Sequence, residues 1–271
     1  MALTKKLTAL LATRAELDAN LSNKLRKSIL QQAIQGLLVE QNPDDEPASI
    51  LLEKIKAEKE RLIKEKKIKR DKQDSFIYRG DDNKYWEKRG KEIVCIDDEI
   101  PFEIPNTWTW TRLSNVFQIN PKNEAEDEVE AAFVPMERID ATFFSSYTFA
   151  KRKWGEIKRG FTHFANGDVA FAKITPCFQN RKSIILRDLP NGIGAGTTEL
   201  KVLRSYGNTI VQEYLLFFLE SPYFIDEAVF KGTANQQRII SGYLENKLFP
   251  LPPISEQNRI VEAVKRAWQV L

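Results

Sequence analysis

The sequence predicts an α+β protein, with one mixed α/β domain over residues 98–250 and long coiled-coil-forming helices on either side of it. Three observations predict this class. Leucines recur at heptad spacing near the N-terminus. Short β-prone runs separated by turn residues fill the middle of the chain. An amphipathic helical pattern then occupies residues 251–271.

The composition argues against membrane, metal and disulfide-framework proteins. Of the 271 residues, 42% are hydrophobic, which is enough for a core, and the net charge is only +3. Any surface for nucleic acid must therefore come from the distribution of charge. Two distant cysteines and one histidine form no metal pattern, so we expect no metal and no cofactor. Because no apolar run reaches membrane length and no secretory signal is evident, we expect a cytoplasmic protein.

The first predicted element is a scaffold helix within residues 1–38. No proline interrupts it, and Gly36 stands where a helix would end. Its leucines recur at steps of three, four or seven residues, which is typical of a coiled-coil seam. The seam positions are Leu7, Leu10, Leu17, Leu21 and Leu25. A surface helix lying on its own domain is the alternative, but so narrow a stripe favours pairing with another helix.

Residues 39–97 predict a linker that contains one charged helix. Two prolines and four acids in "EQNPDDEPAS" break the first helix, and an apolar helical pattern resumes after them. Lysines crowd the later part of this second helix. They indicate a solvated helix face, with DNA-phosphate binding as the alternative. Because residues 71–90 are polar, we expect them to be loosely ordered.

The α+β domain is predicted from short runs between residues 98 and 250. Prolines precede β-prone runs that contain Trp108 and Trp110. Residues 211–230 predict a helix, a Ser-Pro break and a second helix. Further strand candidates lie in "FVPMERID", "GDVAFAKI", "KSIILRDL" and "TELKVLR".

Residues 251–271 predict the start of a second scaffold helix. A proline-rich entry precedes Ser255, which we expect to be the N-cap. Ile260, Val261 and Val264 begin an apolar face. The two terminal helices are expected to pair in an antiparallel arrangement, either with each other or with a second copy.

A catalytic role is weakly supported. Pro176-Cys177 within "FAKITPCFQNRK" is the pair with which cytosine methylases attack a base, so a stand-alone methylase that uses Cys177 is one alternative. A site for the methyl donor would require glycines that lie after a strand and at the start of a helix. The glycines of "NGIGAGTTE" do not have this placement. A half-buried structural cysteine in a turn is far commoner. We therefore expect a protein that is not an enzyme.

Binding chemistry is better represented, on three polar loops: the first at residues 173–182, the second at residues 194–199 and the third at residues 231–242. Asn and Gln can read adenine, Arg can read guanine, and Lys and Thr can hold phosphates. One polar loop alone would carry little weight, but three loops of the same chemistry favour a double-stranded DNA surface. The candidates are Lys173, Thr175, Gln179, Asn180, Arg181, Lys182, Thr197, Thr198, Lys231, Thr233, Gln236, Gln237 and Arg238.

Five stretches resemble the specificity subunits of type I restriction–modification systems. They are "LRKSILQQAIQGLLVEQNPDDEPASILLEKIKAEKERLIKEKKIKR", "EIPNTWTWTRL", "GDVAFAKITPCFQNRKSI", "NGIGAGTTELKVLR" and "LFPLPPISEQNRIVEAV". The resemblance implies that residues 98–250 are a DNA target-recognition domain, which reads one half of a bipartite target. It also implies that the terminal helices are scaffold segments. Those segments space two recognition domains and dock the modification subunits.

The resemblance further implies that methylation, ATP hydrolysis and cleavage belong to the modification and restriction subunits. A full family member has two recognition domains, whereas this chain has one, with one complete scaffold segment and the start of another. It is expected to be either a fragment of a longer subunit or a half-subunit that pairs with a copy of itself or with a second half-subunit. A protein-interaction scaffold that has lost DNA reading is the remaining alternative.

Overall fold

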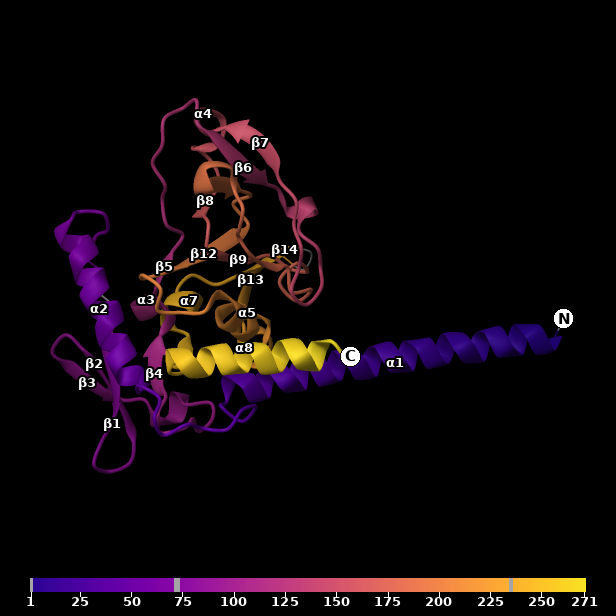
Figure 1. Cartoon of the computed structure of the whole chain (residues 1–271), viewed down its shortest axis with the longest axis horizontal. Coiled ribbons are helices and arrows are strands. Elements are labelled where there is room, and N and C mark those ends of the chain that lie inside the picture. The colour runs from indigo at the N-terminus through magenta and orange to yellow at the C-terminus, as the bar shows by residue number, and fades with distance from the viewer. Residues whose placement is uncertain (1, 71–73, 234–235) are drawn as a thin grey trace.

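The computed structural model describes residues 2–70, 74–233 and 236–271, with the side chains of all of these except residues 2–10, 15 and 19. The strands lie in one mixed body, from which a long helix projects (Figure 1). We call strands β4 to β15 and the helices between them the head. Helices and sheets are both present, so the predicted α+β class with a long N-terminal helix is confirmed.

The projecting helix is α1 (Ala2–Ile34). Its C-terminal end is packed on the head, where Leu30, Ala33 and Ile34 are completely buried. Its N-terminal part extends away from every other element (Figure 1). The expected stop at Gly36 is confirmed: its φ of +71° suits glycine, and a Cβ there would lie 2.5 Å from Pro105.

Helix α8 (Ile254–Trp268) lies beside α1 and runs in the opposite direction (Figure 1). Ser22 Oγ donates a hydrogen bond of 2.7 Å to the backbone oxygen of Leu271. The two terminal helices therefore pair with each other in this chain. The N-cap prediction was wrong: Pro253 caps α8, and the Ser255 hydroxyl instead bonds the carboxylate of Asp45, which follows the first helix.

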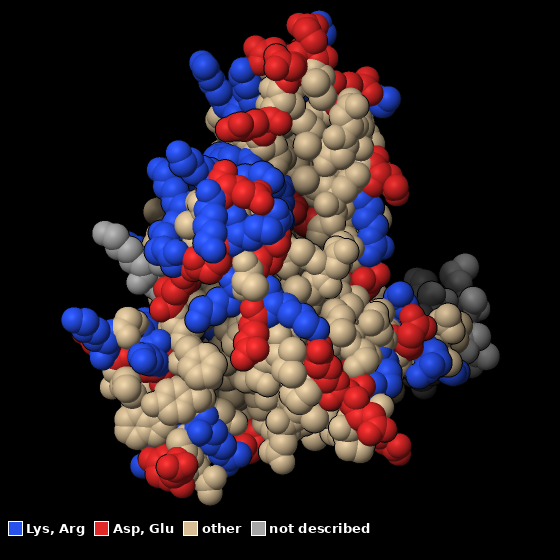
Figure 2. Space-filling view, turned by 60° about the vertical axis from the view of Figure 1, so that its left-hand side comes forward, with Lys and Arg blue, Asp and Glu red and all other residues tan. Residues whose placement is uncertain are grey.

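Helix α2 (Ala48–Lys64) buries Leu51 and Ile55 against the head and turns its charged face to solvent. Ion pairs join Arg61 to Glu58 and Glu65, and Arg70 to Glu60. Figure 2 shows a dense patch of blue side chains on this face, with a few red ones within it and below it. The lysine-rich run is thus a solvated helix face, some of whose charges are paired with nearby acids.

The expected loose order of residues 71–90 was wrong for the residues described. Antiparallel strands β1 (Ser75–Arg79), β2 (Tyr85–Arg89) and β3 (Glu92–Cys95) form a sheet in the order β1-β2-β3. The buried apolar residues of this region, Ile77, Tyr85 and Ile96, pack with Trp110 and Leu248 of the head. A small shared core therefore orders a segment whose composition is polar.

The head contains two four-stranded sheets and two strand pairs. One sheet has the order β10-β9-β12-β5, and the other β7-β6-β11-β8. Strand β4 pairs with β15, and β13 pairs with β14. The strands of the first sheet are β5 (Phe117–Ile119), β9 (Val169–Ala172), β10 (Ser183–Ile185) and β12 (Leu200–Ser205). The second sheet comprises β6 (Glu130–Val134), β7 (Ala150–Lys153), β8 (Thr162–Ala165) and β11 (Ile193–Gly196). The pairs comprise β4 (Thr109–Arg112), β15 (Leu248–Leu251), β13 (Phe230–Thr233) and β14 (Gln236–Ile239).

The main core lies between the first sheet and the helices. Helix α5 (Gln212–Glu220) buries every residue from 214 to 220 and packs against α1, α6 (Pro222–Asp226), α8 and β10. The predicted helix, Ser-Pro break and helix are confirmed, because Ser221 ends α5 and caps α6 by accepting a hydrogen bond from Phe224 N. The short helices are α3 (Leu113–Val116), α4 (Trp154–Ile157) and α7 (Tyr243–Asn246).

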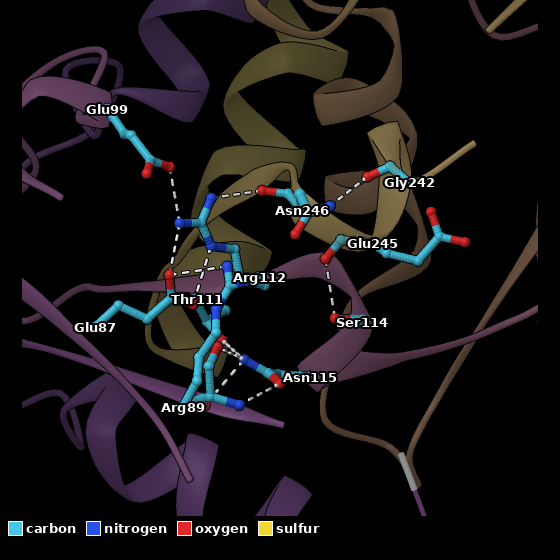
Figure 3. A network of polar contacts seen from close by, with 11 residues as sticks. Glu87, Arg89, Glu99, Thr111, Arg112, Ser114, Asn115, Gly242, Glu245 and Asn246 are labelled. Atoms are coloured by element: carbon cyan, nitrogen blue, oxygen red, sulfur yellow. Dashed lines mark hydrogen bonds and ion pairs between the residues drawn. The ribbon is translucent and has the colours of Figure 1, made fainter. Parts of the chain in front are cut away.

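A buried ionic network fastens the β1–β3 sheet to the head. The guanidinium of Arg112 lies between Glu87 and Glu99 and also donates to the backbone oxygen of Asn246 on α7 (Figure 3). Arg112 and Glu87 side chains are only 5% and 3% exposed. Burial alone would raise the pKa of Glu87, but hydrogen bonds led by that from Arg112 lower it to about 2.

The lowered pKa predicts a loss of stability in acid. The folded-state pKa of Glu87 lies below its ordinary value of 4.5. The ionised carboxylate therefore contributes fully to the free energy of unfolding above pH 4.5, and this contribution disappears as the pH falls toward about 2. We expect Glu87→Gln to cost about 2–3 kcal/mol of unfolding free energy at neutral pH, and much less at pH 3. Urea unfolding at both pH values measures this, with the exposed Glu92→Gln as control. An equal cost at both pH values would contradict the assignment.

Candidate nucleic-acid interface

The β13–β14 hairpin, which carries the third predicted loop, is extended by the backbone of the first predicted loop. Thr175 N donates to the backbone oxygen of Gln237 at 2.9 Å, and Ile239 N donates to that of Lys173 at 3.0 Å. The Thr175 hydroxyl also accepts from Gln237 N at 3.1 Å. Gly232 permits the tight pairing, because a Cβ there would lie 2.4 Å from the backbone oxygen of Gln236. Residues 173–175 and the hairpin therefore form one unit.

The second predicted loop joins the same unit through Glu199. Lys173 N donates to the backbone oxygen of Glu199 at 2.8 Å. The Glu199 carboxylate accepts from the guanidinium of Arg238, with a shortest distance of 2.7 Å. That hydrogen bond lowers the pKa of Glu199, so the pair is ionised. Three loops that are separate in sequence thus converge on one edge of the head.

A turn over residues 175–181 carries the Pro-Cys pair; we call it the Pro176 turn. The Thr175–Pro176 peptide is cis, and Cys177 is a half-buried free thiol. Phe178 is 3% exposed and packs among aromatic rings of the core, which anchors the turn. Cys177 therefore occupies the structural position expected of a small side chain in a turn.

The Pro176 turn exposes two amides, whereas the cations at its end and just after it are bound to backbone oxygens. Gln179 and Asn180 are exposed. Arg181 instead donates from Nε to the backbone oxygen of Glu220 at 3.1 Å and lies 4.7 Å from the centre of the Phe143 ring. Burial lowers the pKa of Arg181. Lys182 Nζ donates to the backbone oxygen of Met136 at 3.0 Å.

The structure therefore sorts the thirteen sequence candidates by their availability. Those exposed to solvent are Gln179, Asn180, Thr198, Lys231, Thr233 and Gln236. Those half-buried are Lys173, Thr175, Arg181, Lys182, Thr197, Gln237 and Arg238. Of the second group, Thr197 accepts a hydrogen bond from Glu199 N, and burial lowers the pKa of Lys173. Asn235, which belongs to the third loop, lies outside the described residues.

One wall of the interface was not anticipated from the sequence. A groove of about 550 Å³ separates the Pro176 turn from α1, and we call it the α1 groove. The α1 side of its lining comprises Asn20, Asn23, Lys24, Arg26 and Lys27. The i, i+3, i+4, i+7 spacing of residues 20, 23, 24 and 27 is a signal that could have revealed this polar stripe.

A second, larger cleft of about 960 Å³ lies between the end of α2 and strand β5. Six lysine and arginine residues line it, but several are neutralised. Lys59 pairs with Asp74, Lys67 with Glu65 and Arg204 with Asp168. Two acidic residues complete its lining. Its charge is therefore less one-sided than that of the α1 groove.

The seam predicted on α1 is exposed where side chains are described. Leu17, Leu21 and Leu25 are 64%, 57% and 40% exposed. The side chains of Leu7 and Leu10 lie outside the described residues. Helix α8 thus covers a different face of α1 and leaves this one open.

Among residues 2–70, 74–233 and 236–271, no three His, Cys, Asp or Glu side chains gather closely enough to hold a metal ion. No helix in the described part of the chain is both long and apolar enough to span a membrane.

Comparison with known proteins finds clear relatives, although no family model matches. The chain is 43% identical over 263 residues to the Type I restriction enzyme EcoAI specificity subunit of Escherichia coli, covering 96% of this chain and 42% of that subunit. It is also 43% identical over 242 residues to the EcoEI specificity subunit of the same organism, covering 88% of this chain and 38% of that subunit. The chain therefore spans about two-fifths of the length of these relatives.

A solved structure shares the fold. The HsdS subunit from Thermoanaerobacter tengcongensis matches with a TM-score of 0.50 and 24% identity, over 63% of this chain and 45% of that one. This likeness supports the arrangement of helices and strands described above.

Proposed function

We propose, from the premise that this chain is a relative of type I restriction-enzyme specificity subunits, that its head is a DNA target-recognition domain that reads one half of a bipartite target. The convergence of the three polar loops carries the proposal, because it gathers base-reading and phosphate-binding groups on one edge of the head. The proposed ligand is double-stranded DNA.

The loops divide the work by exposure. We assign base contacts to the exposed amides of Gln179, Asn180 and Gln236, since Asn and Gln can bond the adenine edge bidentately. Lys231, Thr198 and Thr233 are exposed beside them and suit phosphate contacts.

The two arginines receive a different role from the one the sequence suggested. Arg238 is bound to the Glu199 carboxylate, and Arg181 to the Glu220 backbone. We propose that both hold the loops in place. Reading guanine with Arg238 would leave Glu199 without its partner, which costs free energy in a half-buried site.

In this proposal the chain is not an enzyme. Methylation, ATP hydrolysis and cleavage are assigned to modification and restriction subunits that assemble with it in the cytoplasm. A methylase that uses Cys177 would have to bind a methyl donor, and calorimetry with S-adenosylmethionine, expected to show no heat of binding, tests that alternative.

The reading proposal predicts a defined change in sequence preference. We expect Gln236→Ala and Gln179→Ala each to relax the preference at one position, because each removes one bidentate contact worth about 1–3 kcal/mol. Selection of binding sites from a random duplex pool by the whole chain measures this.

Asn208→Ala is the matched control, because Asn208 is an exposed amide on another loop of the head. It should leave the selected sequence unchanged. Selection of the same sequence by the wild type and both Gln variants would refute these base contacts. The absence of any selected sequence would favour the scaffold without DNA reading.

The helices have a separate role in the proposal. Antiparallel α1 and α8 form a rod, and the open leucine seam on α1 suits a helix from a second copy or a second half-subunit. Such a rod would set the distance between two heads and dock the modification subunits.

A further inference from the structure

The α1 groove lies beside Gln179 and Asn180, which are proposed above to contact bases. The proposed function assigns no ligand to the groove itself. Its floor and walls come from α1, from residues 141–143 and from residues 179–181. The exposed amides of Gln179 and Asn180 form part of one wall, and α1 forms the opposite wall. A ligand that contacts these two amides therefore also meets α1.

The wall from α1 is a single polar stripe. Asn20, Asn23, Lys24 and Lys27 occupy successive turns on one side of the helix. A rise of about 1.5 Å per residue places Lys24 and Lys27 about 4.5 Å apart along the helix axis. Both lysines are exposed. Their long side chains can reach neighbouring phosphates on one strand.

The charge of the groove is one-sided. Its lining contains four basic residues, Lys24, Arg26, Lys27 and Arg181, and four amide side chains, but no Asp or Glu. In the described part of the chain, no ion pair is found for Lys24 or Lys27. The Nε of Arg26 is buried without a hydrogen-bond partner. An anionic ligand with hydrogen-bonding groups suits this lining better than a neutral one does.

We propose that the α1 groove holds the sugar-phosphate backbone of the duplex whose half-site the head reads, with Lys24 and Lys27 on its phosphates. This inference rests on the proposed function. It makes the scaffold helix a DNA-contacting element as well as a spacer. Because α1 continues outward from the head beyond the groove, these contacts lie at the edge of the half-site and do not depend on base sequence.

An acidic protein segment is the rival occupant. The amides favour DNA, because Gln179 and Asn180 are continuous through the Pro176 turn with residues 173–175 and the hairpin that carries Gln236. A carboxylate of a bound peptide would contact the groove alone, and would not need these amides to be continuous with the hairpin. The two occupants also differ in their dependence on salt.

The test is a salt titration of duplex binding by the whole chain with Lys24→Gln/Lys27→Gln. We expect the slope of log K against log salt to become shallower by about 1.8, because each phosphate contact contributes about 0.9. The sequence selected from a random pool should stay the same, since no base contact is removed.

The matched control is Lys84→Gln/Lys91→Gln. It removes two exposed lysines from the turns of the β1–β3 sheet and gives the same net charge. An unchanged slope in the groove variant, or an equal change in the control, would overturn the inference. Thermal unfolding of both variants should match the wild type, because all four side chains are exposed.

The two proposals fail differently. If the wild type binds DNA without sequence preference, the proposal that the head reads a half-site is wrong. The slope of log K against log salt then still tests whether the α1 groove binds phosphates. A selected sequence together with an unchanged slope sinks the groove alone. If the groove variant loses a modification subunit in a pull-down but keeps the wild-type slope, an acidic protein occupies the groove and the inference is wrong.

Discussion

Arg112→Met is expected to lower the free energy of unfolding by about 3–5 kcal/mol, because it leaves the buried carboxylate of Glu87 without its main partner. The guanidinium of Arg112 makes two hydrogen bonds to Glu87, at 2.7 and 3.1 Å, and a third to the Asn246 backbone at 2.6 Å. Methionine fills a similar volume but supplies none of these bonds. Chemical denaturation at neutral pH measures the loss.

Two further variants separate the charge from the packing. Arg89→Met removes the other arginine that contacts Glu87, but Arg89 is 41% exposed, so we expect a loss below about 1 kcal/mol. The double variant Arg112→Met/Glu87→Met removes both buried charges and should recover much of the stability lost by Arg112→Met. If the double variant is as unstable as the sum of the two single variants, the network does not act as a buried ion pair.

The same network shows where sequence reasoning stops. The long helix, three strands of the first sheet and the Ser221 break have local signals, namely leucine spacing, short apolar runs and a Ser-Pro pair. The β1–β3 sheet lacks such a signal, because it turns few apolar side chains to the core. Its order comes from that small core together with the ion pair of Glu87 and Arg112, and both join distant parts of the sequence.

The candidate site divides in the same way. Composition was sufficient to select three loops of suitable chemistry, since exposed polar clusters are visible in the sequence. Their convergence depends on backbone pairing between Thr175 and Gln237, which no local pattern encodes. A cation can bind DNA only if no other part of the protein already holds it. Arg181 is bound to the Glu220 backbone and Arg238 to the Glu199 carboxylate, and neither contact is visible in the sequence. The prediction of Ser255 as an N-cap was wrong for the same reason, because its hydroxyl donates to the carboxylate of Asp45 instead.

Leu17→Asp/Leu21→Asp is expected to abolish association of the chain through α1. The two leucines are more than half exposed in the single chain, so the substitutions remove little internal packing and should leave its unfolding nearly unchanged. An exposed seam at heptad spacing marks a surface that a second helix covers. Burying one leucine there contributes about 2 kcal/mol, so losing two weakens pairing on the order of 1000-fold, before the cost of the buried charges.

Sedimentation of the wild type over a range of concentrations should show self-association that the double variant lacks. Ala12→Asp adds the same kind of charge to an exposed position of α1 outside the seam, and should associate as the wild type does. Helix α8 covers another face of α1, so it cannot satisfy the seam within one chain. A wild type that stays monomeric at every concentration, alone and with a second half-subunit, would show that the seam does not serve helix pairing.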